Sequence, residues 1–140
     1  MNAGNRYELN DSQPKWMLWT GRVLSGLLSL VFLFSAFAKL SGNPQMVSQM
    51  TTTMGYPKGV ILGLGIVELT CLMLYLVPQT AVLGAILLTG YLGGAIATHL
   101  RIGEPFIPQF IFGVIAWGGL FLRDERLRAL IPLRKSSDNG

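Results

Sequence analysis

The sequence predicts an all-α fold: an integral membrane, antiparallel four-helix bundle with a short amphipathic outer helix between the first and second spans. Two observations carry this prediction. The chain of 140 residues is 51% hydrophobic and only 13% charged, whereas soluble domains average about 25% charged residues. The apolar residues also gather in four runs, 23–38, 60–77, 81–98 and 106–122, and Glu68 is the only charged residue in any of them.

Each run, with its flanking residues, is long enough to cross a hydrocarbon core about 30 Å thick at a rise of about 1.5 Å per residue. The predicted spans are 16–40, 59–77, 81–100 and 106–122, which together make a membrane domain over 16–122. The connections at 78–80 and 101–105 are short, so we expect the spans that they join to run antiparallel.

The longer connection between the first two spans, residues 41–57, is predicted to contain a short helix. Asn43 suits the N-cap, Pro44 suits the first helical position, and Gly55 followed by Pro57 ends the helix. Four apolar residues then fall on one face, namely Met46, Val47, Met50 and Met54. We expect this helix to lie flat on the outer surface, where it either caps the mouth of the bundle or simply connects two spans.

The basic residues lie beside the spans and at the chain ends, so the net charge of +4 does not predict nucleic-acid binding. Seven flank one side of the membrane domain, Arg6, Lys15, Arg123, Arg126, Arg128, Arg134 and Lys135, and three flank the other, Lys39, Lys58 and Arg101. The positive-inside rule then places both termini in the cytoplasm, as a polar tail (1–15) and a basic tail (123–140).

Glu68 is the most informative residue, because it lies inside the second span, about 13 Å from its outer end. An ionisable group at mid-bilayer depth costs about 2.5–3.5 kcal/mol on insertion scales, so it needs a partner or a task. Lys39 and His99 belong to the outer ends of their spans. Lys39 either pairs with Glu68 or snorkels to the head groups, and we expect His99 to be an interfacial hydrogen-bonding residue.

The predicted binding site is therefore a polar interior made of Glu68, Lys39 and His99. Four residues are expected to support it, Arg22, Tyr75, Tyr91 and Arg101. No catalytic residue is indicated. Cys71 is the only cysteine, so neither an internal disulfide nor a dithiol motif is available. One histidine and one cysteine on different helices do not predict a metal site.

Several short motifs together resemble the DoxX-like family of small bacterial four-span membrane proteins. They are Phe-Ala-Lys-Leu at 37–40, Asn-Pro at 43–44, Gly-Tyr-Pro at 55–57, Gly-x-x-Glu at 65–68 and Gly-Ala-Ile-Ala-Thr-His at 94–99. The resemblance implies a multi-pass protein of the bacterial inner membrane, with Lys39, Glu68 and His99 as its polar set. Relatives in that family include a subunit of a thiosulfate:quinone oxidoreductase and accessory proteins for maturing redox enzymes.

Three functions remain open at this stage, and the sequence does not decide whether the chain is an enzyme. The leading hypothesis is an accessory or quinone-binding subunit in redox-linked metabolism, in contact with the lipid bilayer and with a membrane redox enzyme or a second copy of the chain. The first alternative is a non-catalytic assembly factor that uses the small-residue face around Gly90 and Gly94. The second is a small-solute or proton pathway formed by an oligomer.

Overall fold

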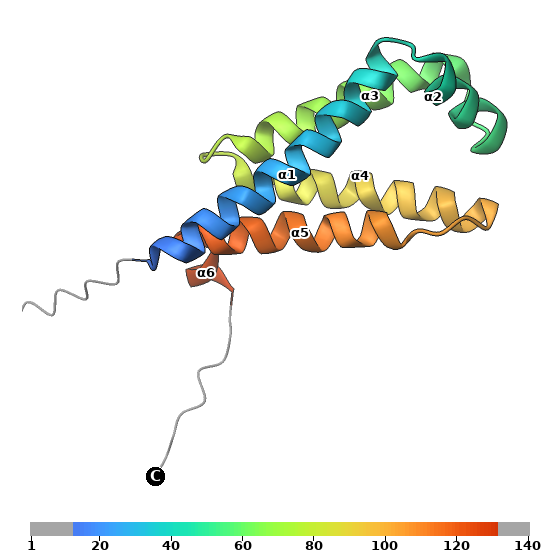
Figure 1. The fold of residues 1–140 in the computed structure, drawn as a ribbon. Coiled ribbons are helices and arrows are strands. Elements are labelled where there is room, and N and C mark those ends of the chain that lie inside the picture. The colour runs from blue at the N-terminus through green and yellow to red at the C-terminus, as the bar shows by residue number, and fades with distance from the viewer. Residues whose placement is uncertain (1–12, 132–140) are drawn as a thin grey trace, which may run out of the picture.

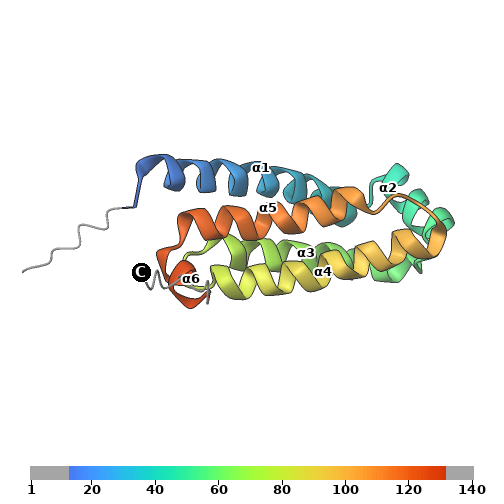
Figure 2. The same ribbon diagram turned by 90° about the horizontal axis from the view of Figure 1, so that it is seen from below.

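The computed structural model describes residues 13–131, which form the all-α bundle that the sequence predicts. The four main helices are α1 (Lys15–Leu40), α3 (Lys58–Leu76), α4 (Ala81–Ile102) and α5 (Ile107–Arg123), and they lie side by side in Figure 1 and Figure 2. Both α1 and α4 pack against α3 and α5, so helices consecutive in the chain are neighbours. This is the up-and-down arrangement expected of short connections.

Three of these helices, α1, α3 and α4, are long and apolar enough to cross a membrane, and α5 is a shorter apolar helix of 17 residues. Large apolar side chains cover the outside of the bundle, among them Leu30, Phe34 and Phe37 of α1, which are 64%, 75% and 69% exposed. Water solvates such a surface poorly, whereas lipid chains cover it without cost. The chain is therefore a multi-pass membrane protein.

The predicted amphipathic helix is present between α1 and α3. It consists of α2 (Pro44–Ser48) and a π-helical turn, η1 (Gln49–Thr53). As an N-cap does, Asn43 Oδ1 accepts hydrogen bonds from the backbone N–H groups of Gln45 and Met46, at 3.0 and 3.2 Å. Gly55, at φ +75°, follows η1 and turns the chain toward α3 in a conformation that favours glycine.

One helix is not anticipated by the sequence analysis. After α5 comes α6 (Glu125–Leu130), whose first N–H groups are capped by the Asp124 carboxylate at 2.9 and 3.3 Å. Leu127 of α6 is buried against the core. The beginning of the predicted basic tail is therefore folded against the bundle, while residues 1–12 and 132–140 of the predicted tails lie outside the described residues.

The bundle has two unlike halves. In the closed half, around Gly21, Tyr75, Gly84 and Gly119, the helices touch backbone to backbone. A Cβ on Gly84 would lie 2.1 Å from the Tyr75 nitrogen, and one on Gly21 would lie 2.7 Å from the Gly119 oxygen, so both positions require glycine. Toward α2, the α1–α3 pair diverges from the α4–α5 pair (Figure 1). We call this second region, around Lys39, Glu68 and His99, the open half.

Candidate functional site

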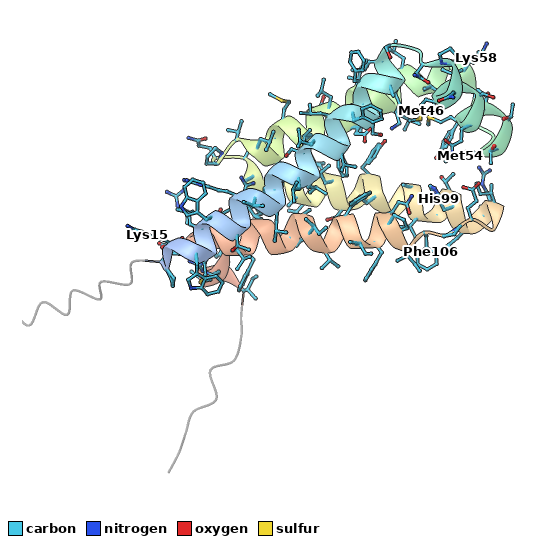
Figure 3. All side chains as sticks on the ribbon, viewed as in Figure 1. Lys15, Met46, Met54, Lys58, His99 and Phe106 are labelled. Atoms are coloured by element: carbon cyan, nitrogen blue, oxygen red, sulfur yellow. The ribbon has the colours of Figure 1, made fainter. Side chains whose placement is uncertain are left out.

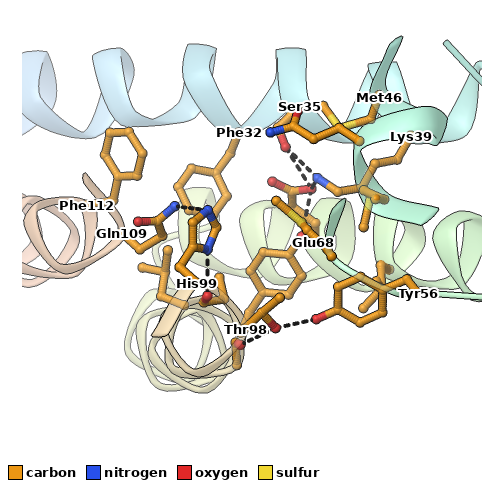
Figure 4. Close-up of a pocket in the computed structure, with 18 of the residues that line it drawn as sticks. Phe32, Ser35, Lys39, Met46, Tyr56, Glu68, Thr98, His99, Gln109 and Phe112 are labelled. Carbon is orange, nitrogen blue, oxygen red and sulfur yellow. Dashed lines mark hydrogen bonds and ion pairs between the residues drawn. The ribbon is translucent and has the colours of Figure 1, made fainter. Parts of the chain in front are cut away.

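A cavity of about 410 Å³ occupies the open half. Side chains of α1, α3, α4 and α5 line its walls, and side chains of α2 and η1 line its outer mouth (Figure 4). Its volume lies within the range of about 300–1,000 Å³ that is usual for small-molecule sites. The lining is largely apolar, with two groups of polar side chains, one around Glu68 and one around His99.

The first polar group is built on a buried ion pair. Lys39 Nζ lies 2.8 Å from Glu68 Oε2, and the two residues are 8% and 3% exposed. Of the two alternatives for Lys39, the structure has the pair with Glu68 and not the side chain that snorkels to the surface. The cation also lies in the last turn of α1, where the helix dipole favours positive charge.

The pairing depends on where α1 ends. Lys39 lies at the outer end of its own span, as expected, because α1 ends at Leu40. That end of α1 lies deeper in the bundle than the start of α3. A Cβ on Gly65 would lie only 3.0 Å from Lys39 Cβ, so the end of α1 sits level with Gly65. Gly65 is seven residues beyond the start of α3 at Lys58, about 10 Å inside it. Lys39 therefore reaches Glu68 from a neighbouring turn, and α2 with η1 covers the space beyond α1.

Three donors converge on one oxygen of Glu68. Besides Lys39, the Tyr91 hydroxyl donates to Oε2 at 3.1 Å and the Ser35 hydroxyl donates to it at 3.3 Å. Ser35 in turn accepts a hydrogen bond from Lys39 Nζ at 2.6 Å. The other carboxylate oxygen, Oε1, receives no hydrogen bond from residues 13–131 and stays accessible from the cavity. In Glu68, therefore, Oε2 accepts three hydrogen bonds and Oε1 accepts none from the described residues.

The second polar group surrounds His99. Its Nδ1 lies 2.8 Å from the carbonyl oxygen of Ala95, which only accepts, so Nδ1 carries the hydrogen. In the neutral ring Nε2 is then an acceptor, and the Gln109 amide nitrogen donates to it at 3.1 Å. Glu104 Oε2 is 3.9 Å from the same Nε2. This assignment leaves Gln109 Oε1 buried without a hydrogen-bond partner in the described part of the chain.

The segment made of α2 and η1 covers the mouth of the cavity. Met46, Met50 and Met54 line the cavity, and Figure 3 shows Met46 and Met54 facing His99 across the open end. Methionine side chains are flexible and polarizable, which suits a surface that adapts to a ligand. The π-helical turn places an irregular backbone at this position, as is frequent at functional sites.

Two contacts to α4 hold this covering segment. The Arg101 guanidinium donates to the carbonyl oxygen of Met54 at 2.6 Å. The hydroxyls of Tyr56 and Thr98 are 2.6 Å apart. Arg101 therefore contacts the covering segment and does not line the cavity.

Two of the predicted supporting residues lie elsewhere. Arg22 is exposed, with its guanidinium 5.7 Å from the centre of the Trp19 ring. Tyr75 is completely buried in the closed half, where Arg123 lies 4.7 Å from its ring centre and donates to its carbonyl oxygen at 2.7 Å. The structure thus brings Lys39, Glu68, Tyr91 and His99 to one cavity and leaves Arg22 and Tyr75 outside it.

Sequence reasoning missed several polar residues of the cavity, namely Ser35, Gln49, Tyr56, Thr98 and Gln109. Ser35 had a usable signal, because it precedes Lys39 by four residues and so shares its helix face. Gln109 is an amide within an apolar span, which also marks a polar partner. Across residues 13–131, no group of three His, Cys, Asp or Glu side chains is placed to hold a metal ion.

Comparison with known proteins gives one match. A family model described as the DoxX-like family matches residues 23–119, well over half of the chain. A search of curated proteins finds no match, and a search of solved structures finds none. Every residue that lines the cavity, from Val31 to Phe112, falls within the matched stretch.

Proposed function

This chain belongs to the DoxX-like family of membrane proteins, and we propose that it is a subunit that binds a lipophilic ligand with a polar head group, such as a quinone, in redox-linked metabolism. The observation that carries this proposal is the Lys39–Glu68 pair in the wall of an apolar cavity. A buried pair of charges costs several kcal/mol per ion in desolvation and is often replaceable by apolar residues without loss of stability. A binding role explains why it is present here.

The remainder of the cavity suits a flat ring. The ring centres of Phe32 and Tyr91 are 6.5 Å apart, and those of Phe32 and Phe112 are 6.1 Å apart, so three aromatic side chains form one wall. Aromatic rings favour tilted and offset contacts with one another and with aromatic ligands. An apolar lining with a small number of polar groups is the usual composition of a lipophile site.

For the membrane orientation, we propose that both termini face the cytoplasm of a bacterial cell, so that the cavity opens toward the outer side of the inner membrane. Lys39 does not count toward the outer charge, because Glu68 neutralises it. Among the described residues, that leaves Lys58 and Arg101 at the outer end of the bundle. The opposite end carries more basic residues, namely Lys15 at the start of α1, Arg123 at the end of α5, and Arg126 and Arg128 of α6. A partner redox enzyme in the membrane would exchange the ligand with this chain.

The two alternative functions have less support. An assembly factor was expected to use the small-residue face around Gly90 and Gly94, but both glycines line the cavity. They leave room there for a ligand, because a Cβ on either would meet no atom of the described residues within 4 Å. A solute or proton pathway needs a second copy of the chain to form it.

Filling the cavity tests the proposal. Gly94→Leu places a side chain in the cavity without a backbone clash, and Gly63→Leu makes the same change at an open, exposed position of α3 outside the cavity lining. The probe is a short-chain quinone presented in both redox forms to the detergent-purified protein, with binding measured at equilibrium. We expect wild type and Gly63→Leu to bind, and Gly94→Leu to bind at least about tenfold more weakly. Equal binding by all three proteins, or no saturable binding by wild type, would refute the proposal.

A further inference from the structure

We propose, building on the function above, that this cavity selects the reduced form of its ligand, a hydroquinone, because Glu68 Oε1 stands in its wall as a free acceptor for a ligand hydroxyl. The hydrogen bonds around the cavity determine which polar hydrogen atoms the protein has already used and which positions remain for a ligand to fill.

The hydroxyl hydrogens of the lining are donated within the protein. Those of Ser35 and Tyr91 go to Glu68 Oε2 at 3.3 and 3.1 Å. That of Thr98 goes to the carbonyl oxygen of Gly94 at 2.9 Å. Since the hydrogen of Thr98 is used in this way, the Tyr56 hydroxyl is the donor in the 2.6 Å contact between the two. Each of these four groups can therefore only accept a further hydrogen bond.

The imidazole of His99 is used in the same way. Its single N–H is donated to Ala95, and Gln109 donates to its other nitrogen. Gln109 Oε1 has no hydrogen-bond partner among residues 13–131, but it is buried within the protein and does not face the ligand position beside Glu68.

Donors remain as well, because Lys39 Nζ and Gln109 Nε2 each keep one hydrogen and Gln49 keeps its amide hydrogens at the mouth. Glu68 Oε1 differs from these groups because it is an anionic acceptor that only a ligand donor can pair. A hydroquinone hydroxyl can donate to Oε1 and accept from Lys39, whereas a quinone oxygen can only accept.

A buried acceptor without a donor is unfavourable, and more so when it is a carboxylate oxygen. The two oxygens of a quinone also only accept, so next to Glu68 Oε1 they would add a repulsive contact. A hydroquinone carries a hydroxyl in the same place and would donate to Oε1. Hydrogen bonds to an ionised acceptor are about twice as strong as neutral ones, so the discrimination is expected to be large.

The ligand itself provides the first test, with the wild-type protein unchanged. Equilibrium binding is measured for a short-chain hydroquinone, its quinone, and the dimethyl ether of the hydroquinone, which keeps the ring but has no hydroxyl hydrogen. We expect the hydroquinone to bind at least about tenfold more tightly than either of the others. If the quinone or the ether binds as tightly, this inference fails and the proposed function stands. If none of the three binds, both fail.

The second test reverses the polarity of the site. In Glu68→Gln, the three donors on Lys39, Ser35 and Tyr91 should hold the amide oxygen at the position of Oε2. The amide N–H₂ then replaces Oε1, so a free acceptor becomes a donor. The ratio of hydroquinone to quinone affinity should fall by at least about tenfold and favour the quinone.

A merely structural role for Glu68 would weaken both ligands alike and leave the ratio of affinities unchanged, which would overturn the inference. Thr89→Val is the matched control, because Thr89 Oγ1 bonds to Trp117 outside this cavity, and it should leave the ratio as in wild type. Should Glu68→Gln fail to fold, the comparison of three ligands on the wild-type protein decides the question alone.

Discussion

The closed and open halves of the bundle contain similar residues, but these residues have different roles in the two halves. Each half links a tyrosine hydroxyl to a serine of α1, directly between Tyr75 and Ser25 in the closed half and through Glu68 Oε2 between Tyr91 and Ser35 in the open half. In the closed half Tyr75 is fully buried, lies 3.0 Å from Ser25 and donates to the Ala116 carbonyl oxygen at 2.7 Å. In the open half Tyr91 is only partly buried and its partner Glu68 keeps one oxygen free. The first arrangement completes a core, and the second leaves a position for a ligand.

Helix spacing accounts for the difference. Glycines bring the backbones together in the closed half, so no space remains beside Tyr75. In the open half the two pairs of helices diverge, and Gly90 and Gly94 have no close neighbour among the described residues. The same residue type therefore makes a tight contact at one end and enlarges a cavity at the other. Mutations should affect stability in the closed half and binding in the open half.

The largest effect is expected at Gly84. In Gly84→Ala the new methyl group would lie 2.1 Å from a backbone nitrogen of α3, so the α3–α4 contact must open and we expect little folded protein. Gly94→Ala is the control, with open space at its Cβ within the described structure. Thermal unfolding in detergent measures both. A Gly84→Ala protein that melts within about 2 °C of wild type would contradict the account of the closed half.

The next largest effect is expected from breaking the ion pair. Lys39→Met leaves the Glu68 carboxylate buried without its cation and should lower the free energy of unfolding by about 3–5 kcal/mol. The double variant Lys39→Met/Glu68→Leu removes both charges, so it should regain most of that stability while losing the ligand. Denaturant unfolding and ligand binding, measured on the same preparations, separate the two effects. A Lys39→Met protein as stable as wild type would contradict the account of a buried, ionised pair.

The two tyrosines give a direct comparison of the halves. Tyr75→Phe removes the buried hydrogen bonds of its hydroxyl with Ser25 and with the Ala116 carbonyl oxygen, and should cost about 1–3 kcal/mol of stability without changing ligand affinity. Tyr91→Phe removes one of the three donors that fix Glu68 Oε2, so it should weaken ligand binding about three- to tenfold at a smaller cost in stability. The reverse pattern, with Tyr75→Phe impairing binding, would remove the distinction between the halves.

The smallest effect is expected at the cover. Arg101→Gln removes the bond to the Met54 carbonyl oxygen, which lies at the surface and contributes less than about 1 kcal/mol. The cover should open more often, so the ligand should dissociate a few times faster while the unfolding temperature stays unchanged. Lys58→Gln, an exposed lysine at the same end, serves as the control. If both variants release the ligand at the wild-type rate, the segment of α2 and η1 does not control entry.

Hydropathy and helix signals were sufficient to predict the architecture. The long apolar runs predict the main helices, and the N-cap at Asn43 and the glycine at Gly55 predict where the short outer helix begins and ends. Both signals are local, so they survive in any packing arrangement. The helix α6 escaped prediction because its sequence is highly charged, and its stability depends on one buried leucine that meets the core only after folding.

The candidate site was predicted only in part, for a reason that Glu68 and Tyr75 make clear. They lie seven residues apart on one face of α3, so periodicity assigns them the same surroundings. The helix passes through both halves of the bundle, however, and only the spacing of its neighbours decides which residue meets a cavity. The level at which α1 ends is a similar quantity, because the depth of Lys39 depends on the whole bundle.

A structure of the protein with hydroquinone bound tests the central claim most directly. We predict density for a flat ring against Phe32, with one ligand oxygen within hydrogen-bond distance of Glu68 Oε1 and the Lys39–Glu68 pair intact. Ligand density only on the outer, lipid-facing surface, or a Glu68 side chain turned toward the acyl chains and away from Lys39, would contradict it.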